Sequence, residues 1–223
     1  QALKVGTEIH NDFVTEVDFN SSPYTSTTDS GLIFKSKTII ISTGAKARWL
    51  EIESEEKFKG YGISACATCD GFFFKDQEVA VIGGGNSAVE EALFLTNFAS
   101  KVTLIHRRDQ LRAEKILQDR LFKNPKVEII WNNTVKKFQG NIDTPALEKI
   151  VLKSTTDNSE SELKVSGAFI AIGHDPSTSL FLNKLKMDKE NYIITKPDST
   201  VTSIPGVFAA GDVKDKIYRQ AVT

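Results

Sequence analysis

Two cysteines, Cys66 and Cys69, stand three positions apart in a chain of 223 residues that has no other cysteine. Thiols at this spacing can close a disulfide, open to a dithiol and pass electrons by thiol–disulfide exchange. The same spacing occurs in zinc sites, but a tetrahedral zinc ion needs four ligands. The three histidines, His10, His106 and His174, lie far from the pair in the sequence. The pair therefore indicates redox chemistry, and we expect no metal site.

An acidic residue and a glycine follow the second cysteine, as Asp70-Gly71. A carboxyl group beside a reactive dithiol can give or take the proton that a thiolate exchanges. Asp-Gly is also a common turn signal and needs no chemical role to explain it. Asp70 is therefore a candidate catalytic residue beside Cys66 and Cys69, with a simple turn as the alternative.

A glycine-rich segment lies between a predicted strand, Glu78–Ile82, and a predicted helix, Asn86–Phe98. Its sequence, Gly83-Gly84-Gly85-Asn86-Ser87-Ala88, fits the pattern G-x-G-x-x-A. The glycines allow a tight turn and a close approach of a pyrophosphate, which the N–H groups and dipole at the helix N-terminus favour. The alternative is a tight turn without a ligand. Because strand, turn and helix follow in the required order, the sequence predicts dinucleotide binding.

The end of the next predicted strand, Lys101–Ile105, indicates which nucleotide is bound. An NAD site would place an acid there to accept hydrogen bonds from the ribose 2′-hydroxyl. This chain has His106-Arg107-Arg108 instead, with Arg112 one helical turn further on. Guanidinium groups bind a 2′-phosphate through charge-assisted bonds. The alternative is an exposed basic strand end, but the cluster favours NADPH.

A second cofactor site is suggested by Gly211-Asp212, which follows the predicted strand 207–210. The Asp212 carboxylate would accept a hydrogen bond from a cofactor hydroxyl, or it would serve as a helix N-cap. In addition, two predicted buried strands end in a glycine at matching places, Thr43-Gly44 and Ile172-Gly173. Two related nucleotide-binding domains would produce such a repetition.

The predicted elements that position these groups follow from the apolar patterning. Alternation over residues 1–47 indicates a strand meander that ends in a buried strand at Thr38–Ile41. The order strand, glycine turn, helix, strand over residues 78–105 indicates a βαβ unit with a parallel sheet, and hence an α/β fold. Beyond it we expect a helix at 113–122, strands at 127–131 and 134–138, and a hairpin of 150–153 with 163–172.

Composition limits the class of protein. A net charge of −1 gives no electrostatic reason to expect binding to nucleic acid or to an anionic membrane. No apolar run approaches the length that crosses a bilayer, and the first residues do not form a signal peptide. A single C-x-x-C pair, without cysteines spread along the chain as staples, is typical of a cytoplasmic redox protein.

Taken together, these segments resemble the low-molecular-weight NADPH-dependent thioredoxin reductases of bacteria and plants, and the resemblance runs over almost the whole chain. The matching motifs are Cys66-Ala67-Thr68-Cys69-Asp70-Gly71, Gly83–Ala88 with Glu90-Glu91, His106-Arg107-Arg108-Asp109 with Arg112-Ala113-Glu114, Thr202–Val213, and Tyr218-Arg219-Gln220-Ala221. The resemblance implies two Rossmann-like, three-layer nucleotide-binding domains, with an NADPH domain that carries the C-x-x-C inserted into an FAD domain. Residues 1–47 and 175–223 would form the FAD domain, and residues 48–174 the NADPH domain. Compared with the family, we expect the FAD domain to lack its N-terminal FAD-binding segment and its C-terminal helix.

The resemblance also implies the site residues and the route of the electrons. FAD contacts fall on Thr43, Gly44, Ala45, Gly211, Asp212, Arg219, Gln220 and Ala221. NADPH contacts fall on Gly83, Gly85, Asn86, Ser87, Ala88, Glu90, His106, Arg107, Arg108, Arg112, Ile172, Gly173 and His174. Electrons would pass from NADPH through FAD to the Cys66/Cys69 dithiol, with Asp70 as the acid, and then to thioredoxin. Cys69 would face the flavin and Cys66 would attack the partner, in a protein that forms homodimers.

Two alternatives remain open at this point. The flavoprotein subunit of alkyl hydroperoxide reductase shares C-x-x-C-D-G before a similar glycine turn, although it lacks the His106–Arg108 basic cluster. The chain could also be a non-catalytic NADPH-binding fragment, because part of the flavin site is expected to be missing.

Overall fold

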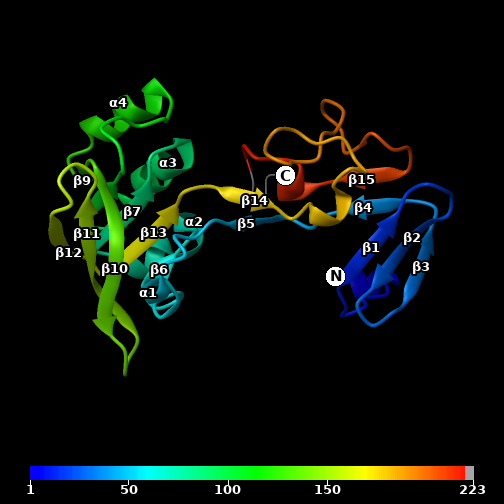
Figure 1. The fold of residues 1–223 in the computed structure, drawn as a ribbon, viewed down its shortest axis with the longest axis horizontal. Coiled ribbons are helices and arrows are strands. Elements are labelled where there is room, and N and C mark those ends of the chain that lie inside the picture. The colour runs from blue at the N-terminus through cyan, green and yellow to red at the C-terminus, as the bar shows by residue number, and fades with distance from the viewer. Residues whose placement is uncertain (219–223) are drawn as a thin grey trace. The chain divides into compact units, whose positions relative to one another are not determined.

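The computed structural model describes residues 1–218 and divides the chain into two compact units. The inserted unit comprises Ala47–His174, and the split unit comprises Gln1–Lys46 together with the chain from Asp175 onward. The chain thus passes between the units twice. The strands at these two crossings, β5 (Ala45–Ala47) and β14 (His174–Pro176), pair with each other (Figure 1).

The inserted unit is built on a five-stranded sheet in the order β6-β13-β7-β8-β9, in which every neighbouring pair is parallel. Its strands are β6 (Ile63–Ser64), β13 (Gly167–Ala171), β7 (Glu78–Gly83), β8 (Lys101–Ile105) and β9 (Val127–Ile130). Strands covered on both faces need nearly continuous apolar residues, and β7, β8 and β13 have them.

The two faces of this sheet are covered by different layers. Val79 and Val81 pack with helix α3 (Asn86–Leu95) and helix α4 (Lys115–Lys123). Ala80 and Ile82, which point the other way, pack with an antiparallel sheet. That sheet consists of β10 (Asn133–Asn141), β11 (Ala146–Ser154) and β12 (Glu160–Lys164). The inserted unit is therefore a three-layer ββα arrangement, and the predicted α/β, Rossmann-like fold is confirmed.

The predicted hairpin of 150–153 with 163–172 is correct where Ile150 pairs with Leu163 and wrong from Gly167 onward. Residues 160–164 form β12, which pairs with β11, whereas Gly167–Ala171 forms β13 in the middle of the parallel sheet. The pattern changes at Ser166: before it, polar residues alternate with apolar ones, and after it all five residues are buried. One predicted strand was in fact two strands belonging to different sheets.

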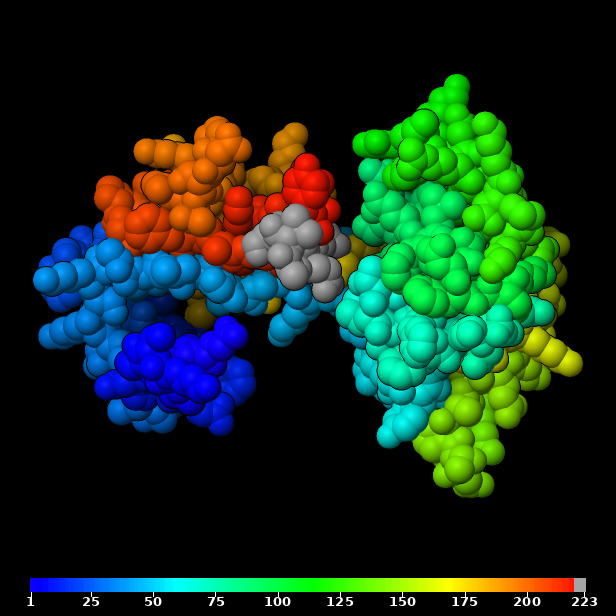
Figure 2. Space-filling model, turned by 180° about the vertical axis from the view of Figure 1, so that it is seen from behind, coloured from blue at the N-terminus to red at the C-terminus, as the bar shows by residue number. Residues whose placement is uncertain are grey.

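The split unit brings both ends of the chain together, as the blue and orange segments in Figure 2 show. It contains an antiparallel meander, β1 (Val14–Asp18), β2 (Tyr24–Thr28) and β3 (Ile33–Ser36), and a parallel pair, β4 (Ile39–Ile41) and β15 (Val207–Ala209). Ile41, Val207 and Ala209 lie in its core. The prediction of a buried strand at residues 38–41 is correct for Ile41, which is buried, and wrong for Ile40, which is 70% exposed.

Short helical turns complete the described chain. They are η1 (Ala2–Val5), α1 (Glu53–Glu56), α2 (Ala67–Asp70), η2 (Gly71–Phe74), η3 (Ser179–Phe181) and η4 (Gly211–Val213). Within residues 1–218, no helix has both the length and the apolar character needed to span a membrane. In the same range, no cluster of three or more His, Cys, Asp or Glu side chains is arranged to hold a metal ion.

Candidate functional site

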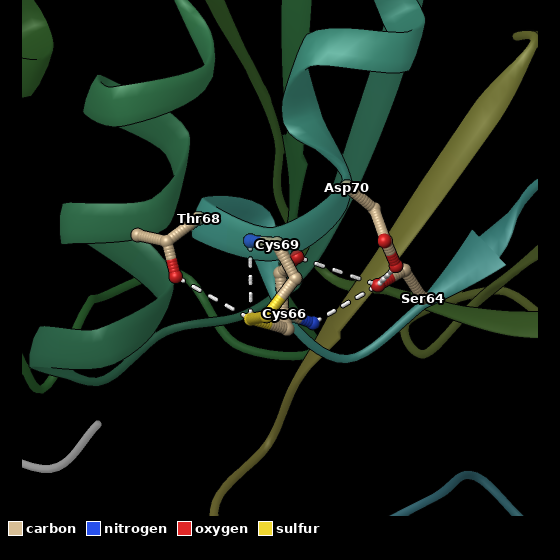
Figure 3. The surroundings of a disulfide bond; sticks show 5 residues. All are labelled: Ser64, Cys66, Thr68, Cys69 and Asp70. Atoms are coloured by element: carbon tan, nitrogen blue, oxygen red, sulfur yellow. Dashed lines mark hydrogen bonds between the residues drawn. A yellow bond between two sulfur atoms is a disulfide. The ribbon is translucent and has the colours of Figure 1, made fainter. Parts of the chain in front are cut away.

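The two cysteines form a disulfide at the start of helix α2, directly after edge strand β6 (Figure 3). Their Cα atoms are 5.3 Å apart. Cys66 is the N-cap of α2, and Cys69 lies one helical turn further on, where its side chain is exposed. The C-x-x-C spacing thus becomes a single turn of helix, which holds both sulfur atoms at the surface of the inserted unit.

The two sulfur atoms have different surroundings. The backbone N–H of Cys69 donates to Cys66 Sγ at 3.2 Å, and the Thr68 hydroxyl lies 3.3 Å from the same sulfur. Both donors would stabilise negative charge on Cys66 after the disulfide opens. Both of these hydrogen-bonding groups converge on Cys66 Sγ.

Asp70 makes its hydrogen bond on the other side of the turn. Its Oδ2 accepts a hydrogen bond from the Ser64 hydroxyl at 2.6 Å, and Ser64 Oγ in turn accepts one from the backbone N–H of Cys66 at 3.0 Å. Ser64 is buried at the end of β6, and Asp70 is half-buried. The carboxylate is therefore held next to the Cys66 backbone by one intervening side chain, which the sequence analysis did not identify.

Exposed aromatic side chains follow the disulfide in the sequence. Phe72 and Phe73, two and three residues beyond Asp70, are 66% and 72% exposed. Phe72 also makes edge-on ring contacts with Phe73 and Phe98. The redox pair is thus followed by an exposed apolar surface, which is a common property of protein-binding sites.

A second site lies at the carboxyl edge of the parallel sheet. Strands β7, β8 and β13 run in the same direction, so the residues that follow them meet at one edge. A cavity of about 490 Å³ opens there. It is lined by Arg48, Leu50, Ile52, Ile82, Gly83, Gly84, Gly85, Asn86, Ser87, Ile105, His106, Arg107, Arg112, Asn133, Thr134, Val135, Ala171, Ile172 and Gly173.

A side chain would meet different surroundings at each glycine of the turn. A Cβ on Gly83 would collide with the backbone of Ala171 and with Ala88, which explains the small residue at the last position of the motif. A Cβ on Gly84 would collide with the His106 ring. Gly85, the N-cap of α3, has open space beside it. The turn is therefore closed toward the core and open toward the cavity.

The basic segment after β8 is fastened to the glycine turn. The N–H of Arg112 donates to the Gly84 carbonyl at 2.7 Å, and the N–H of Glu114 donates to Asn86 Oδ1 at 2.8 Å. His106 Nε2 lies 3.0 Å from the Gln110 carbonyl, which can only accept, so this nitrogen carries the proton. These bonds hold the segment that carries the arginines against the cavity.

His106 differs from the arginines with which the sequence analysis grouped it. Its side chain is 5% exposed, and burial lowers its pKa, to which the positive charges of Arg112 and Arg108 also contribute. The imidazole is therefore neutral at pH 7 and lies against Gly84, while Arg107 and Arg112 are exposed.

Nine of the residues predicted for NADPH come together around this cavity, and four do not line it. Those at the cavity are Gly83, Gly85, Asn86, Ser87, His106, Arg107, Arg112, Ile172 and Gly173. Those outside its lining are Ala88, Glu90, Arg108 and His174.

One side of the cavity, formed by Arg48, Leu50 and Ile52, was not predicted from the sequence. This segment is held by Glu55, which is 1% exposed and accepts hydrogen bonds from the N–H groups of Leu50 and Glu51 at 3.0 Å each. The role of Glu55 could not be read from the sequence, because it accepts hydrogen bonds from backbone N–H groups, which every residue except proline has.

The split unit has a similar but smaller edge. Strands β4 and β15 are parallel, so Thr43-Gly44 and Gly211-Asp212 follow their ends on the same side. Gly44 and Gly211 have φ values of 70° and 78°, and a Cβ on either would meet open space. Asp212 lies inside η4, whose N-cap is Ala210, so Asp212 is not a helix N-cap. The predicted Arg219, Gln220 and Ala221 lie outside the described residues.

Comparison with known proteins matches all of this chain. The family model for pyridine nucleotide-disulphide oxidoreductases covers residues 1–223. Thioredoxin reductase of Rickettsia felis is 57% identical over 223 residues, which are 100% of this chain and 72% of the relative. The crystal structure of thioredoxin reductase from Streptococcus pyogenes has a TM-score of 0.82 and 44% identity, and the match covers 94% of this chain and 67% of that one. Thioredoxin reductase from Giardia duodenalis gives a TM-score of 0.86 at 34% identity, over 99% and 72% of the two chains.

The chain belongs to the thioredoxin reductase family of pyridine nucleotide-disulphide oxidoreductases. Thioredoxin reductases are flavin-dependent disulfide oxidoreductases that use FAD and NADPH. In this family, a close cysteine pair such as Cys66–Cys69 is the redox-active dithiol.

The residues present fit both cofactors of a thioredoxin reductase. For NADPH, the observation is the open space at Gly85 beside the N-terminus of α3, where the first N–H groups have no intrahelical partner. Exposed guanidinium groups border the same cavity. For FAD, the observation is the open backbone at Gly44 and Gly211, at the carboxyl ends of adjacent parallel strands.

Proposed function

We propose that this protein is a thioredoxin reductase that carries electrons from NADPH through FAD and the Cys66–Cys69 pair to the disulfide of thioredoxin. The observation that carries the proposal is the disulfide itself, exposed on the same unit that contains the glycine-lined cavity with its arginines. Relatives with up to 57% identity over the whole chain, named thioredoxin reductases, support it.

We assign NADPH to the cavity of the inserted unit. The backbone from Gly83 to Ala88 would approach the pyrophosphate, and Asn86, Ser87 and Glu90 would contact the nucleotide from α3. The basic residues His106, Arg107, Arg108 and Arg112 would form the environment of the 2′-phosphate, with Arg107 and Arg112 nearest to the cavity and His106 behind the turn. Ile172, Gly173 and His174 would border the nicotinamide end.

We assign FAD to the carboxyl edge of β4 and β15 in the split unit. Thr43, Gly44 and Ala45 follow one strand, and Gly211 and Asp212 follow the other. The Asp212 carboxylate would accept a hydrogen bond from a flavin hydroxyl. For Arg219, Gln220 and Ala221, which lie outside the described residues, contact with FAD stays a prediction.

Bound FAD supplies the chemistry that converts the hydride of NADPH into a two-electron reduction of a disulfide. Two electrons and one proton, which bound FAD would supply from NADPH, would convert the disulfide into a Cys69 thiol and a Cys66 thiolate, on which the Thr68 hydroxyl and the Cys69 N–H converge. The Cys66 thiolate then attacks the thioredoxin disulfide, and Cys69 resolves the mixed disulfide. Asp70 gives and takes the protons of these exchanges.

The surroundings of the dithiol suit a protein substrate. The exposed rings of Phe72 and Phe73, three and four residues after Cys69, offer apolar contact area. We further propose a cytoplasmic homodimer that binds neither nucleic acid nor membranes. A lone redox cysteine pair and a net charge of −1 support the compartment and the absence of such partners, and the resemblance to the family supports the dimer.

The decisive test is cysteine replacement in the FAD-loaded protein. Cys66→Ser and Cys69→Ser should each abolish NADPH-dependent thioredoxin reduction, measured as NADPH consumption with oxidised thioredoxin as acceptor. Binding of NADPH, measured by calorimetry, should stay as in the unchanged protein, because neither cysteine lines the cavity. Retained turnover in either variant would disprove the role of the dithiol.

A further inference from the structure

Ser64 occupies a fixed position next to the redox pair. It is the last residue of β6, is 9% exposed, and is held in the parallel sheet by the pairing of β6 with Phe169 of β13. The cysteines, by contrast, lie on a four-residue helix beyond the end of that strand. Ser64 is thus the point at which the rigid sheet meets the reactive turn.

The Ser64 hydroxyl joins two parts of that turn (Figure 3). It donates to Asp70 Oδ2 at 2.6 Å and accepts from the Cys66 N–H at 3.0 Å. Other groups, the Thr68 hydroxyl and the Cys69 N–H, form the hydrogen bonds to the sulfur of Cys66. Ser64 therefore acts on the carboxylate and on the backbone of Cys66, without a hydrogen bond to either sulfur.

A serine in this position can serve Asp70 in both of its protonation states. When Asp70 is ionised, the serine O–H donates to it, as observed. When Asp70 carries a proton, its O–H can donate to Ser64 Oγ instead. The serine hydrogen then has a second acceptor, the Cys66 carbonyl, at a long 3.5 Å. A hydroxyl is both donor and acceptor, so the exchange needs only its rotation.

We propose that Ser64 is a positioning residue of the reductase reaction, which holds Asp70 beside Cys66 while the carboxyl group alternates between its ionised and protonated forms. The proposal rests on the proposed function, because it assumes that Asp70 handles the protons of the dithiol.

The alternation follows from the proton balance of the reaction. Two electrons and one proton turn the disulfide into a Cys69 thiol and a Cys66 thiolate, and Asp70 holds a second proton. When Cys66 attacks thioredoxin, the first thioredoxin thiolate leaves and takes the proton from Asp70. Cys69 gives its own proton to Asp70 as it resolves the mixed disulfide, and Asp70 passes that proton to the second leaving thiolate. Asp70 therefore changes charge several times in one turnover. At the end of the turnover the disulfide is closed again and Asp70 is ionised.

The test compares Ser64→Ala, Ser64→Thr and Asp70→Asn in the FAD-loaded protein. Ser64→Ala should lower kcat for thioredoxin reduction about tenfold, the value of a hydrogen bond to a charged group, with KM for thioredoxin unchanged. Ser64→Thr keeps the hydroxyl and should restore most of kcat. In the Asp70→Asn background, Ser64→Ala should cause no further loss, because the group through which it acts is gone.

Ser54→Ala is the matched control, since Ser54 is also buried in the inserted unit and its Oγ also accepts a backbone N–H, that of Phe138 at 2.9 Å. It should lose stability without losing kcat. Full kcat in Ser64→Ala, a Ser64→Thr variant as slow as Ser64→Ala, or additive losses in the double variant would each overturn the proposal. If Asp70→Asn alone keeps full kcat, the acid role in the proposed function fails instead.

Discussion

The two candidate sites of the inserted unit, the glycine-lined cavity and the dithiol turn, differ in the groups that form them. The edge of the cavity that we assign to NADPH consists mostly of backbone: glycines at which a Cβ would collide with the core, a helix N-terminus, and a basic segment fastened by the hydrogen bond from the Arg112 N–H to the Gly84 carbonyl. The dithiol turn is mostly side chain: two sulfur atoms, two hydroxyls and a carboxylate on a four-residue helix at the sheet's edge.

This difference teaches where each region is sensitive to change. A backbone site is damaged by added atoms, because its shape depends on close packing. A side-chain site is damaged by removed atoms, because its chemistry depends on particular donors and acceptors. Substitutions at the two regions should therefore fail in opposite ways.

The largest effect is expected at Gly84. In Gly84→Ala, the new methyl group collides with the His106 ring, which is 5% exposed. We expect a loss of about 1–3 kcal/mol in the free energy of unfolding and no measurable NADPH binding. Urea denaturation and calorimetry would measure the two effects.

Gly85→Ala is the matched variant, because the space beside Gly85 is open and its φ of −93° suits alanine. It should unfold like the unchanged protein and bind NADPH more weakly, since the methyl group enters the cavity. Equal stability of the two variants would contradict the steric account of the turn.

The next effect concerns the side chains that supplement this backbone site. Arg107→Ala and Arg112→Ala should each weaken NADPH binding about tenfold to a hundredfold, because each removes a charge-assisted bond to the 2′-phosphate. NADH, which has no such phosphate, should bind as before. Calorimetric titration with both nucleotides measures the ratio, with Arg120→Ala on helix α4, outside the cavity lining, as the control. An equal loss of NADH affinity would argue against phosphate recognition.

A smaller effect is expected at the dithiol turn. Thr68→Val preserves the shape of the side chain but removes the hydroxyl that lies 3.3 Å from Cys66 Sγ. The reduced protein should then react about two- to tenfold more slowly with iodoacetamide at Cys66, because one neutral hydrogen bond to the thiolate is lost. Peptide mass spectrometry would follow the alkylation, with exposed Thr144→Val as the control. An unchanged rate would assign the stabilisation to the Cys69 N–H alone.

The smallest effect is a dependence of stability on pH. Burial lowers the pKa of His106, so the folded protein binds fewer protons there than the unfolded chain does once the pH falls below about 6.5. The free energy of unfolding should therefore decrease as pH drops through this range. Urea denaturation at pH 7.5 and pH 5.5 would show it, and His106→Asn should show a smaller decrease. The same decrease in both proteins would place its cause elsewhere.

The backbone site was largely predictable from the sequence, and the dithiol turn only in part. The glycine turn and the basic strand end depend on local order along the chain, so Gly83–Ala88 and Arg107 could be placed in advance. The cysteine pair itself was also visible. Ser64 and Thr68 were not singled out, because serine and threonine are common residues. Their hydroxyls matter here because of the groups that they contact in the folded chain, Asp70 and Cys66 Sγ.

Long-range pairing limited the prediction of the fold. Residues 163–172 were predicted as one strand, because nothing local in the sequence indicates that β13 lies in the middle of the parallel sheet while β12 pairs with β11. Ile40 looked buried because its neighbours are apolar, yet it is exposed in a two-stranded pair. In both cases the burial of a strand depends on partners that are distant in the sequence.

Strands β5 and β14 pair where the chain enters and leaves the inserted unit, so the two ends of that unit lie next to each other. A segment with adjacent ends can be spliced into a surface loop of another protein without stretching the host. The cavity that we assign to NADPH and the cysteine pair both lie within Ala47–His174 and would move together. The inserted unit could therefore be transferred as one piece, and it would need a flavin from its new host to pass electrons from the nucleotide to the cysteines.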